Sequence, residues 1–225
     1  MIGGIICCVL GLFGCATAPS SSTPSGKLSL FNGKNLQGWR AYLASHEVGP
    51  EQVWQVRHRI LFCRGQPMGY LYTTQSFQNF RLIVEWRWPP GSKPGNSGIF
   101  LRINGEPRPL PRCVEVQLKS GNAGDLFGFH GMALDGPPER IRKIVGHKLG
   151  GNMTALVRIR TAERPSGEWN RAEIILQGDR LSVVINGQKV NEAWGVEQIR
   201  GPIGLQSEGS PIEFRRVELI PLSSH

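Results

Sequence analysis

Two neighbouring segments show the clearest alternation of apolar and polar residues in the chain. In residues 113–119 the apolar positions are Val114, Val116 and Leu118, and the polar positions are Glu115, Gln117 and Lys119. In residues 97–103 the apolar positions Ile99, Leu101 and Ile103 alternate with Phe100 and Arg102. A period of two predicts β-strands with unlike faces. We therefore expect one face in the core and the other face, with Glu115, Gln117, Lys119 and Arg102, to open onto one concave groove.

Similar short strand patterns recur along most of the chain. Further strands are expected at residues 29–31, 53–56, 59–62, 69–73, 80–88, 154–159, 173–176, 180–185, 188–190, 203–206 and 212–220. The longest run, Phe80 to Trp88, places Trp86 and Trp88 on its apolar face, and we expect both in the core. Many short strands, frequent turn signals and no long helical period predict an all-β sandwich of two antiparallel sheets.

One long stretch shows no convincing period. Residues 120–151 are rich in glycine and contain Asp125, His130, Asp135 and His147. A connection of this length is unusual in a compact domain and is often functional. We therefore expect a long functional loop in this part of the chain.

The N-terminal residues differ in composition from the rest. Residues 2–13 form an uncharged apolar run that leads to Cys15 and a Ser/Thr/Pro/Ala tract. The run is too short to span a bilayer comfortably, and a small residue before cysteine is typical of a bacterial lipoprotein signal. The expected parts are a signal peptide (1–14), a low-complexity tether lipidated at Cys15 (15–27) and one folded domain (28–222). The mature protein would be anchored in the bacterial cell envelope and face the periplasm or the exterior.

Composition and charge restrict the class of partner. The chain has 225 residues, 40% of them hydrophobic, which suits one domain with a sizeable core. Its 26 Lys and Arg exceed its 17 Asp and Glu, which gives a net charge of +9. These basic residues are dispersed and form no recognisable nucleic-acid module, so we expect no nucleic-acid partner.

Two cysteines would remain in the mature chain after Cys15, namely Cys63 and Cys113. The sequence contains no CxxC or HExxH pattern, so we expect no structural zinc site. In an oxidising compartment the two thiols could pair, although their spacing does not establish that they approach each other.

Seven motifs, in this order, resemble the 3-keto-disaccharide hydrolase family. They are residues 30–39, Glu85-Trp86-Arg87-Trp88, residues 96–102, Glu115-Val116-Gln117, Glu168-Trp169-Asn170, residues 184–187 and residues 201–215. The resemblance covers residues 28–222 and implies a concanavalin A-like lectin/glucanase jelly roll. It also implies cleavage of glycosides that are already oxidised to a ketone at C3. The ketone acidifies the C2 proton, so the C1 substituent can leave by elimination and water can then add.

The sequence departs from this family pattern at two positions. Glu208 stands where many relatives have Asp-His-Gly, and Arg216 stands where asparagine is usual. Both departures bear on the precise substrate and on any metal requirement.

Four residues are candidates for the chemistry. Glu115 could take the C2 proton or bind a cation, and its alternative role is a salt bridge to Arg102 or Lys119. Arg102 and Lys119 could hold the developing enolate oxygen at C3, or they could be ordinary surface charges. His130, in a glycine-rich setting, would suit a proton shuttle or a ligand, with a structural role as the alternative.

Other residues would complete the site. The expected substrate contacts are Asn96, Gln117, Asp125, Gln206 and Glu208. The one cofactor considered is a divalent cation, for which Glu115, His130 and Glu208 are the candidate ligands.

Two other functions are compatible with the same fold. A conventional glucanase needs two carboxylates that flank the scissile bond. We reject that chemistry because Gln117 and Lys119, not a second acid, follow Glu115 along its strand. A non-catalytic carbohydrate-binding module stays open, since it needs no acid/base pair and would leave 3-keto-sugars unchanged.

Overall fold

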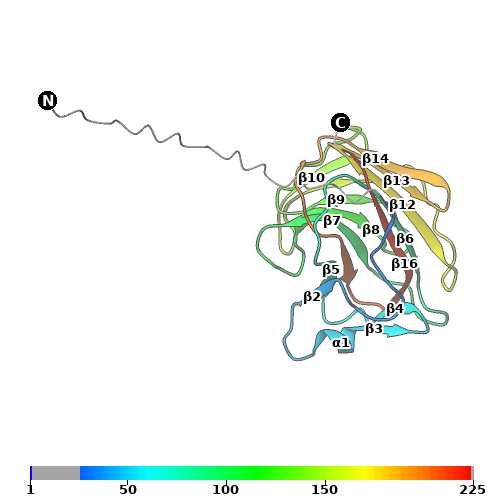
Figure 1. Ribbon diagram of the computed structural model, residues 1–225. Coiled ribbons are helices and arrows are strands. Elements are labelled where there is room, and N and C mark those ends of the chain that lie inside the picture. Colours follow the sequence, from blue (N-terminus) through cyan, green and yellow to red (C-terminus); the bar gives the residue numbers. More distant parts are fainter. Residues whose placement is uncertain (2–25, 224–225) are drawn as a thin grey trace.

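The computed structural model describes Met1 and residues 26–223 (Figure 1). The expected lipidation site, Cys15, and nearly all of the expected signal peptide and tether lie outside the described residues. Among the described residues, no helix is both long enough and apolar enough to cross a membrane.

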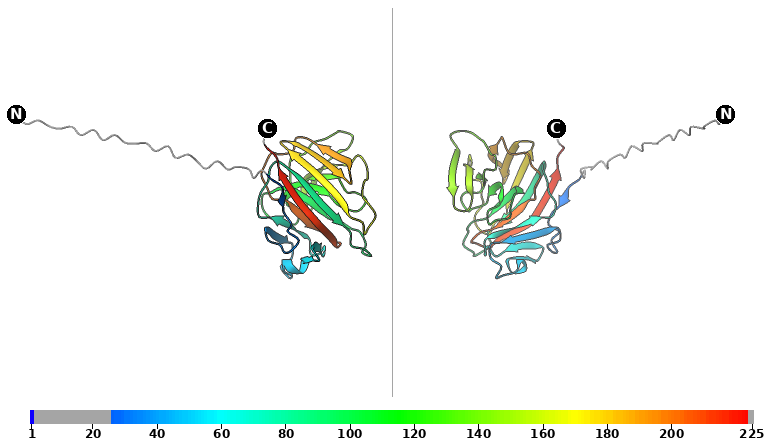
Figure 2. Two further views of the ribbon diagram at one scale, coloured as in Figure 1. Left: turned by 45° about the vertical axis from the view of Figure 1, so that its right-hand side comes forward. Right: turned by 90° about the vertical axis from the view of Figure 1, so that its left-hand side faces the viewer.

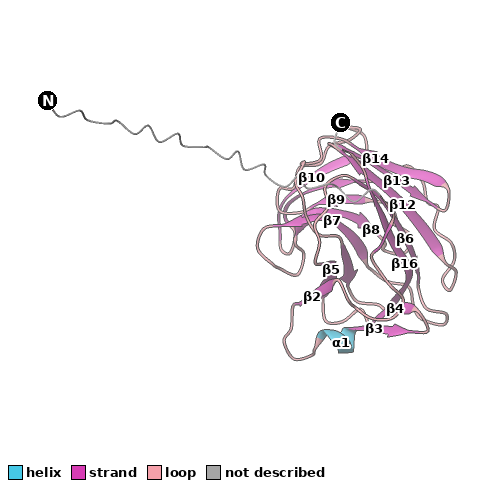
Figure 3. Ribbon diagram, in the orientation of Figure 1, coloured by secondary structure: helices cyan, strands magenta, loops and turns pink. Residues whose placement is uncertain are grey.

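The strands form two antiparallel sheets of eight strands each. The first sheet has the order β14 (Gln188–Ala193), β13 (Arg180–Ile185), β12 (Asn170–Gln177), β6 (Phe80–Arg87), β16 (Ile212–Pro221), β4 (Ile60–Cys63) and β3 (Trp54–Arg57), and β1 (Leu28–Ser29) pairs with β16. The second sheet has the order β10 (Ile141–His147), β11 (Gly151–Leu156), β9 (Leu126–Gly128), β8 (Arg112–Gln117), β7 (Gly98–Asn104), β15 (Gly204–Ser207), β5 (Gly69–Thr73) and β2 (Trp39–Leu43). The helix α1 (Pro50–Val53) precedes β3 and has a single turn (Figure 3). The predicted all-β sandwich is confirmed.

The core lies between the two sheets. In the left view of Figure 2 the strands β16, β6, β12 and β13 lie in front of the second sheet. The alternating apolar residues of β6 and β8 meet in one buried cluster, which includes Trp86 and Val116. Trp86 and Trp88 are 0% and 1% exposed, so their predicted core position is confirmed. Burial of a large apolar side chain stabilises the fold by roughly 1.5–3 kcal/mol, so this cluster holds the sheets together.

The prediction of one long loop at residues 120–151 is wrong. This stretch contains two strands, β9 and β10, which extend the second sheet beyond β8. β9 has three residues, which is too short to show a period. β10 is the last strand of its sheet and is largely exposed, so it has no buried face that would require alternation.

The two cysteines of the described domain are free thiols. Cys63 belongs to the cluster between the sheets, whereas Cys113 belongs to a second cluster with Phe100 and Tyr70. The sequence leaves their pairing open. In the structure they do not pair, because Cys63 of β4 lies in the core between the sheets, whereas Cys113 of β8 lies on the outer face of the second sheet. Burial raises the pKa of the Cys63 thiol to about 12, as expected for an unreactive core cysteine.

Candidate active site on the outer face of the second sheet

Glu115 lies on the face of β8 that points away from the core. Its neighbours Val114 and Val116 pack between the sheets, so the predicted alternation is confirmed. Across the sheet, Glu115 is opposite Phe100 of β7 and Phe127 of β9. Its side chain is only 1% exposed. A carboxyl group is thus held in an apolar setting on the outer face.

Gly98 provides the space that the Glu115 side chain occupies. A Cβ atom on Gly98 would lie 2.0 Å from Oε1 of Glu115, far inside van der Waals contact. Gly98 has no positive φ, so glycine is required here for space and not for backbone conformation. The Glu115 carboxyl therefore leans from β8 across the backbone of β7.

A second carboxyl group comes from the end of β15. Leu205 is opposite Ile99, and an isolated antiparallel bridge joins Glu208 to Asn96 in the same register. Gln206 consequently lies beside Gly98. The Asn96 and Gln206 side chains both hydrogen-bond to Glu208, and the charge of Glu208 acts on Glu115. Two acids from different strands therefore share one site.

Burial acts on both acids, and the charge of Glu208 acts on Glu115 as well. Burial raises the pKa of Glu115 well above its ordinary value, and the neighbouring Glu208 raises it further. Burial also raises the pKa of Glu208, but hydrogen bonds from Asn96 and Gln206 and the charge of Lys119 oppose this shift. Glu115 is the more strongly perturbed group, so Glu208 is the first of the two to ionise and Glu115 keeps its proton to higher pH.

Three buried oxygen atoms at this site have no hydrogen-bond partner within the described part of the chain. They are Oε1 of Glu115, Oδ1 of Asn96 and Oε1 of Gln206. Buried acceptors without partners are rare and costly in native proteins. A ligand with several hydroxyl donors, such as a sugar, would satisfy them.

Gln117 and Lys119 lie at the same end of the site. Oε1 of Gln117 accepts hydrogen bonds from the backbone N–H groups of Leu118 (3.0 Å) and Lys119 (2.9 Å). This oxygen is therefore already bonded to the backbone at the end of β8. Lys119 is exposed, and its charge lowers the pKa of Glu208. Lys119 is thus a cation whose charge acts on the acid pair, through Glu208.

The prediction that Arg102 faces this site is wrong. A bulge between Leu101 and Asn104 and a φ of +54° turn Arg102 away from the strand alternation. Its guanidinium group donates hydrogen bonds to three backbone carbonyl groups, namely those of Gln78 (2.7 Å), Gly178 (2.8 Å) and Glu197 (2.5 Å). Arg102 is fully buried and ties three loops to the sandwich.

His130 and Asp125 are engaged elsewhere. Nε2 of His130 is 2.9 Å from the carbonyl oxygen of Leu110, and Nδ1 is 3.3 Å from Nη1 of Arg108. Both carboxylate oxygens of Asp125 are 3.1 Å from Nη1 of Arg158. The structure therefore uses these two residues to hold loops, and it does not bring them to Glu115.

The candidate cation ligands do not converge. Across residues 26–223, no group of three His, Cys, Asp or Glu side chains is arranged to hold a metal ion. Glu115 and Glu208 lie together, but His130 is bonded to Leu110 and Arg108. The residues present thus do not fit the predicted cation site.

The tyrosines on the β5 side of the acids were not predicted as site residues. Tyr70 of β5 is opposite Gln206, and Tyr42 of β2 is opposite Tyr70. The alternation of residues 69–73 places Tyr70 and Tyr72 on the other face from Leu71. Only strand order reveals that Tyr70 adjoins Gln206 and that Tyr72 adjoins Gly204. Trp169, in the Glu168-Trp169-Asn170 motif, has guanidinium groups of Arg87 and Arg215 over its ring, each at 4.5 Å.

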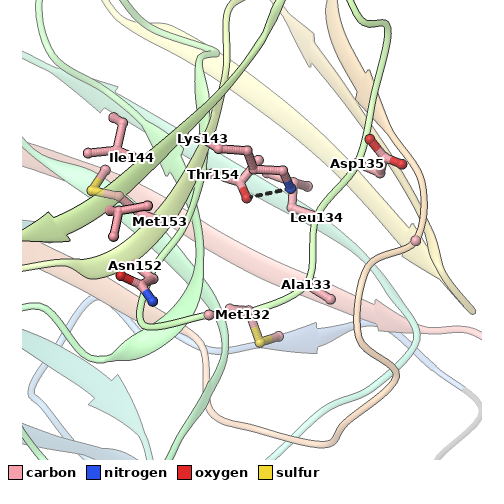
Figure 4. A pocket seen from close by; sticks show the side chains of 12 residues that line it. Met132, Ala133, Leu134, Asp135, Lys143, Ile144, Asn152, Met153 and Thr154 are labelled. Atoms are coloured by element: carbon pink, nitrogen blue, oxygen red, sulfur yellow. Dashed lines mark hydrogen bonds between the residues drawn. The ribbon is translucent and has the colours of Figure 1, made fainter.

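A pocket of about 450 Å³ lies elsewhere, between residues 131–135 and the β10–β11 hairpin (Figure 4). In this pocket Nζ of Lys143 donates a hydrogen bond to Oγ1 of Thr154 (3.0 Å). Asp135 also lines it, and its Oδ1 accepts a hydrogen bond from the N–H of Gly136 (2.8 Å). None of the nine predicted catalytic and substrate-binding residues lines this pocket.

Comparison with known proteins identifies the family and the fold. Residues 26–220 match the family described as the 3-keto-alpha-glucoside-1,2-lyase-like domain. A 3-keto-disaccharide hydrolase from Bacteroides thetaiotaomicron is 25% identical over 244 aligned positions, which cover 86% of this chain and 78% of that protein.

Solved structures share the architecture at lower identity. A structure from Parabacteroides distasonis, provisionally named a glycosyl hydrolase, has a TM-score of 0.63 and 21% identity and covers 88% of this chain and 94% of that one. A β-glucanase from Bacillus licheniformis has a TM-score of 0.54 and 10% identity, covering 89% and 100% of the two chains. A carbohydrate-binding module from Bacillus subtilis has a TM-score of 0.55 and 14% identity, covering 80% and 94%. These likenesses establish the concanavalin A-like jelly roll. Since the family match spans nearly the whole described domain, the chain belongs to the 3-keto-disaccharide hydrolase family.

Proposed function

We propose that this protein cleaves 3-keto-glycosides by elimination and hydration, with Glu208 and Glu115 as the base and acid. The observation that supports this most is the pair of neighbouring carboxyl groups, one buried on β8 and one half-buried at the end of β15. Their environments push their pKa values apart, which is the usual mark of an acid/base assignment. The role of base, expected for Glu115 from the sequence, passes to Glu208 in this proposal.

The first step breaks the glycosidic bond. The Glu208 carboxylate takes the C2 proton, the electron pair of that C–H bond forms the C1–C2 double bond, and the C1–O bond breaks. The leaving oxygen takes the proton of Glu115. Lys119, whose charge already acts on Glu208, stabilises the negative charge that develops on the C3 oxygen.

The second step adds water and restores the acids. Glu115, now ionised, takes a proton from water while the hydroxyl group bonds to C1. Glu208 returns its proton to C2. The products are the free 3-keto-sugar and the alcohol that left, so the net reaction is hydrolysis and both acids regain their starting states.

The proposal is tested with 3-keto-trehalose and 3-keto-glucosides, with and without a chelator. We expect release of the leaving alcohol, no release from the unoxidised glycosides, and no effect of the chelator. Glu115→Gln and Glu208→Gln should each remove most of the activity. Binding of 3-keto-sugars without any cleavage would overturn the proposal in favour of a carbohydrate-binding module.

The proposal also includes an envelope location. The apolar run before Cys15 supports a lipid anchor that would hold the domain on the periplasmic or outer side of a bacterial membrane. Mass spectrometry of the protein from its native host should show an acylated N-terminal Cys15. An unacylated chain that begins upstream of Cys15 would contradict this part of the proposal.

A further inference from the structure

We propose that Tyr42, Tyr70, Tyr72 and Arg40 form a subsite that binds a pyranose ring of the leaving group. We call these four residues the tyrosine shelf. The inference rests on the proposed function, because it assigns the side of the acid pair on which the leaving group lies.

The rings of the shelf form one contiguous cluster. The ring centroids of Tyr42 and Tyr70 are 5.4 Å apart and stacked, with an interplanar angle of 20°. Those of Tyr70 and Tyr72 are 5.5 Å apart and tilted by 52°. Phe100 supports Tyr70 from below with an edge contact at 5.6 Å. Such packed rings are rigid, which limits the entropy lost when a ligand binds.

The outer members of the shelf are accessible, whereas its centre is fixed. Tyr70 is 3% exposed, while Tyr42 and Tyr72 are half-buried and Arg40 is exposed. Arg40 is opposite Tyr72 in the β2–β5 pairing, so its side chain starts from the same face. The Arg40 backbone is part of the β2–β5 ladder, but its side chain makes no hydrogen bond or ion pair among the described residues. The shelf therefore offers aromatic surface for the C–H face of a sugar and free donors for its hydroxyl groups.

Strand order places the shelf next to the acids. Tyr70 is opposite Gln206, which lies beside Gly98, over which the Glu115 carboxyl leans. Neighbouring strands are about 4.8 Å apart, so Tyr70 starts about 10 Å from Gly98, across two strand intervals. A second ring joined to the reacting ring would reach it.

The position of Lys119 sets the direction of the substrate. Lys119 follows β8, and the strand order from there is β7, β15, β5 and β2. Glu115 leans from β8 over Gly98 of β7, and Glu208 follows β15, so both carboxyl groups lie between Lys119 and the shelf. A sugar with its C3 oxygen at Lys119 points C1, and hence the leaving group, toward the shelf.

Guanidinium groups cover two other aromatic rings, those of Phe62 and Trp169. Arg57 covers the ring of Phe62 at 4.8 Å, and Arg87 and Arg215 cover Trp169. The shelf tyrosines contact other aromatic rings, and no cation–π contact covers them among the described residues. Phe62 therefore provides a matched control, because it is a partly exposed ring on the other sheet.

The experiment compares two substrates in the full-length protein. Tyr42→Ala and Tyr72→Ala should each lower kcat/KM for a 3-keto-disaccharide about tenfold, mainly through KM, which corresponds to a loss of about 1.4 kcal/mol. For a methyl 3-keto-glucoside, which has no second ring, the change should be less than about twofold. Tyr42→Phe should keep most of the native kcat/KM for the disaccharide. Phe62→Ala should leave kcat/KM unchanged for both substrates. Equal losses for both substrates, or no loss for either, would overturn the inference.

A binding measurement separates this inference from the proposed reaction. In Glu115→Gln, binding of an unoxidised glucose disaccharide and of methyl glucoside is measured by calorimetry. If no variant cleaves any 3-keto-glycoside, a disaccharide preference that Tyr42→Ala abolishes would still support the shelf. The absence of that preference would refute the shelf whatever the reaction is.

Discussion

The carboxyl group of Glu115 lies over Gly98, with Oε1 2.0 Å from the point where a Cβ atom on Gly98 would be. The two residues come from neighbouring strands, β8 and β7, and are one diagonal step apart in the pairing. The space above a glycine lets a buried acid bend across the sheet toward Glu208. The observed position of the Glu115 carboxyl group therefore requires glycine at position 98.

Gly98→Ala should displace the Glu115 carboxyl group with little effect on the backbone. We expect turnover of a 3-keto-glycoside to fall about a hundredfold, because a displacement of about 1 Å can cost that much. Gly26→Ala is the control, since a Cβ there meets no atom within 4 Å. Native turnover in Gly98→Ala would show that the observed Glu115 position is not needed for catalysis.

The loss of turnover in Glu115→Gln should depend on the leaving group of the substrate. As the acid, Glu115 matters most for a poor leaving group, so the loss should be on the order of a hundredfold or more for methyl 3-keto-glucoside. It should be much smaller for a nitrophenyl 3-keto-glucoside, whose leaving oxygen needs no proton. Glu208→Gln, which removes the base, should impair both substrates alike. The reverse pattern would return the role of base to Glu115.

The acid pair should make folding stability fall as pH rises. The folded-state pKa of Glu115 is raised above its ordinary value of 4.5, so the folded state binds the proton more tightly than the unfolded state. Its stabilising contribution is complete below 4.5 and is lost as pH rises toward the folded pKa. Denaturant titrations from pH 4 to 9 should show this loss in the native protein.

Glu115→Gln should remove part of that pH dependence. The variant has no ionisable group at this position. The difference between its free energy of unfolding and that of the native protein should therefore shift in favour of the variant as pH increases. Glu218→Gln is a useful comparison, because the pKa of Glu218 is lowered by Arg216 and the shift has the opposite sign. An unchanged pH profile in Glu115→Gln would contradict the raised pKa.

Arg102→Met should destabilise the fold without a direct effect on chemistry. The substitution leaves three carbonyl groups without the hydrogen bonds that Arg102 donates to Gln78, Gly178 and Glu197. We expect a loss on the order of 3 kcal/mol in the free energy of unfolding. Below the lowered Tm, the folded variant should retain kcat within about threefold of the native value. A large loss of kcat in folded protein would give Arg102 a role in the site after all.

Local patterns along the sequence determined much of the fold. The alternation at residues 80–88 and 113–119 depends only on which side chains can be buried between sheets, and the structure confirms both strands and the core position of Trp86. The same alternation predicted that Glu115 faces away from the core. It failed at residues 120–151, because the exposed strand β10 has no buried face that would impose a pattern.

Contacts between distant strands decided the composition of the site. Strand order alone brings Glu208 and Gln206 of the β15 end beside Gly98, and Tyr70 beside Gln206. A search for a second acid along β8 could not find Glu208, since the partner comes from another strand. Arg102 left the predicted face because a bulge interrupts the period of two. A sequence reports which face of a strand is apolar, whereas register and bulges depend on the packing of the whole sandwich.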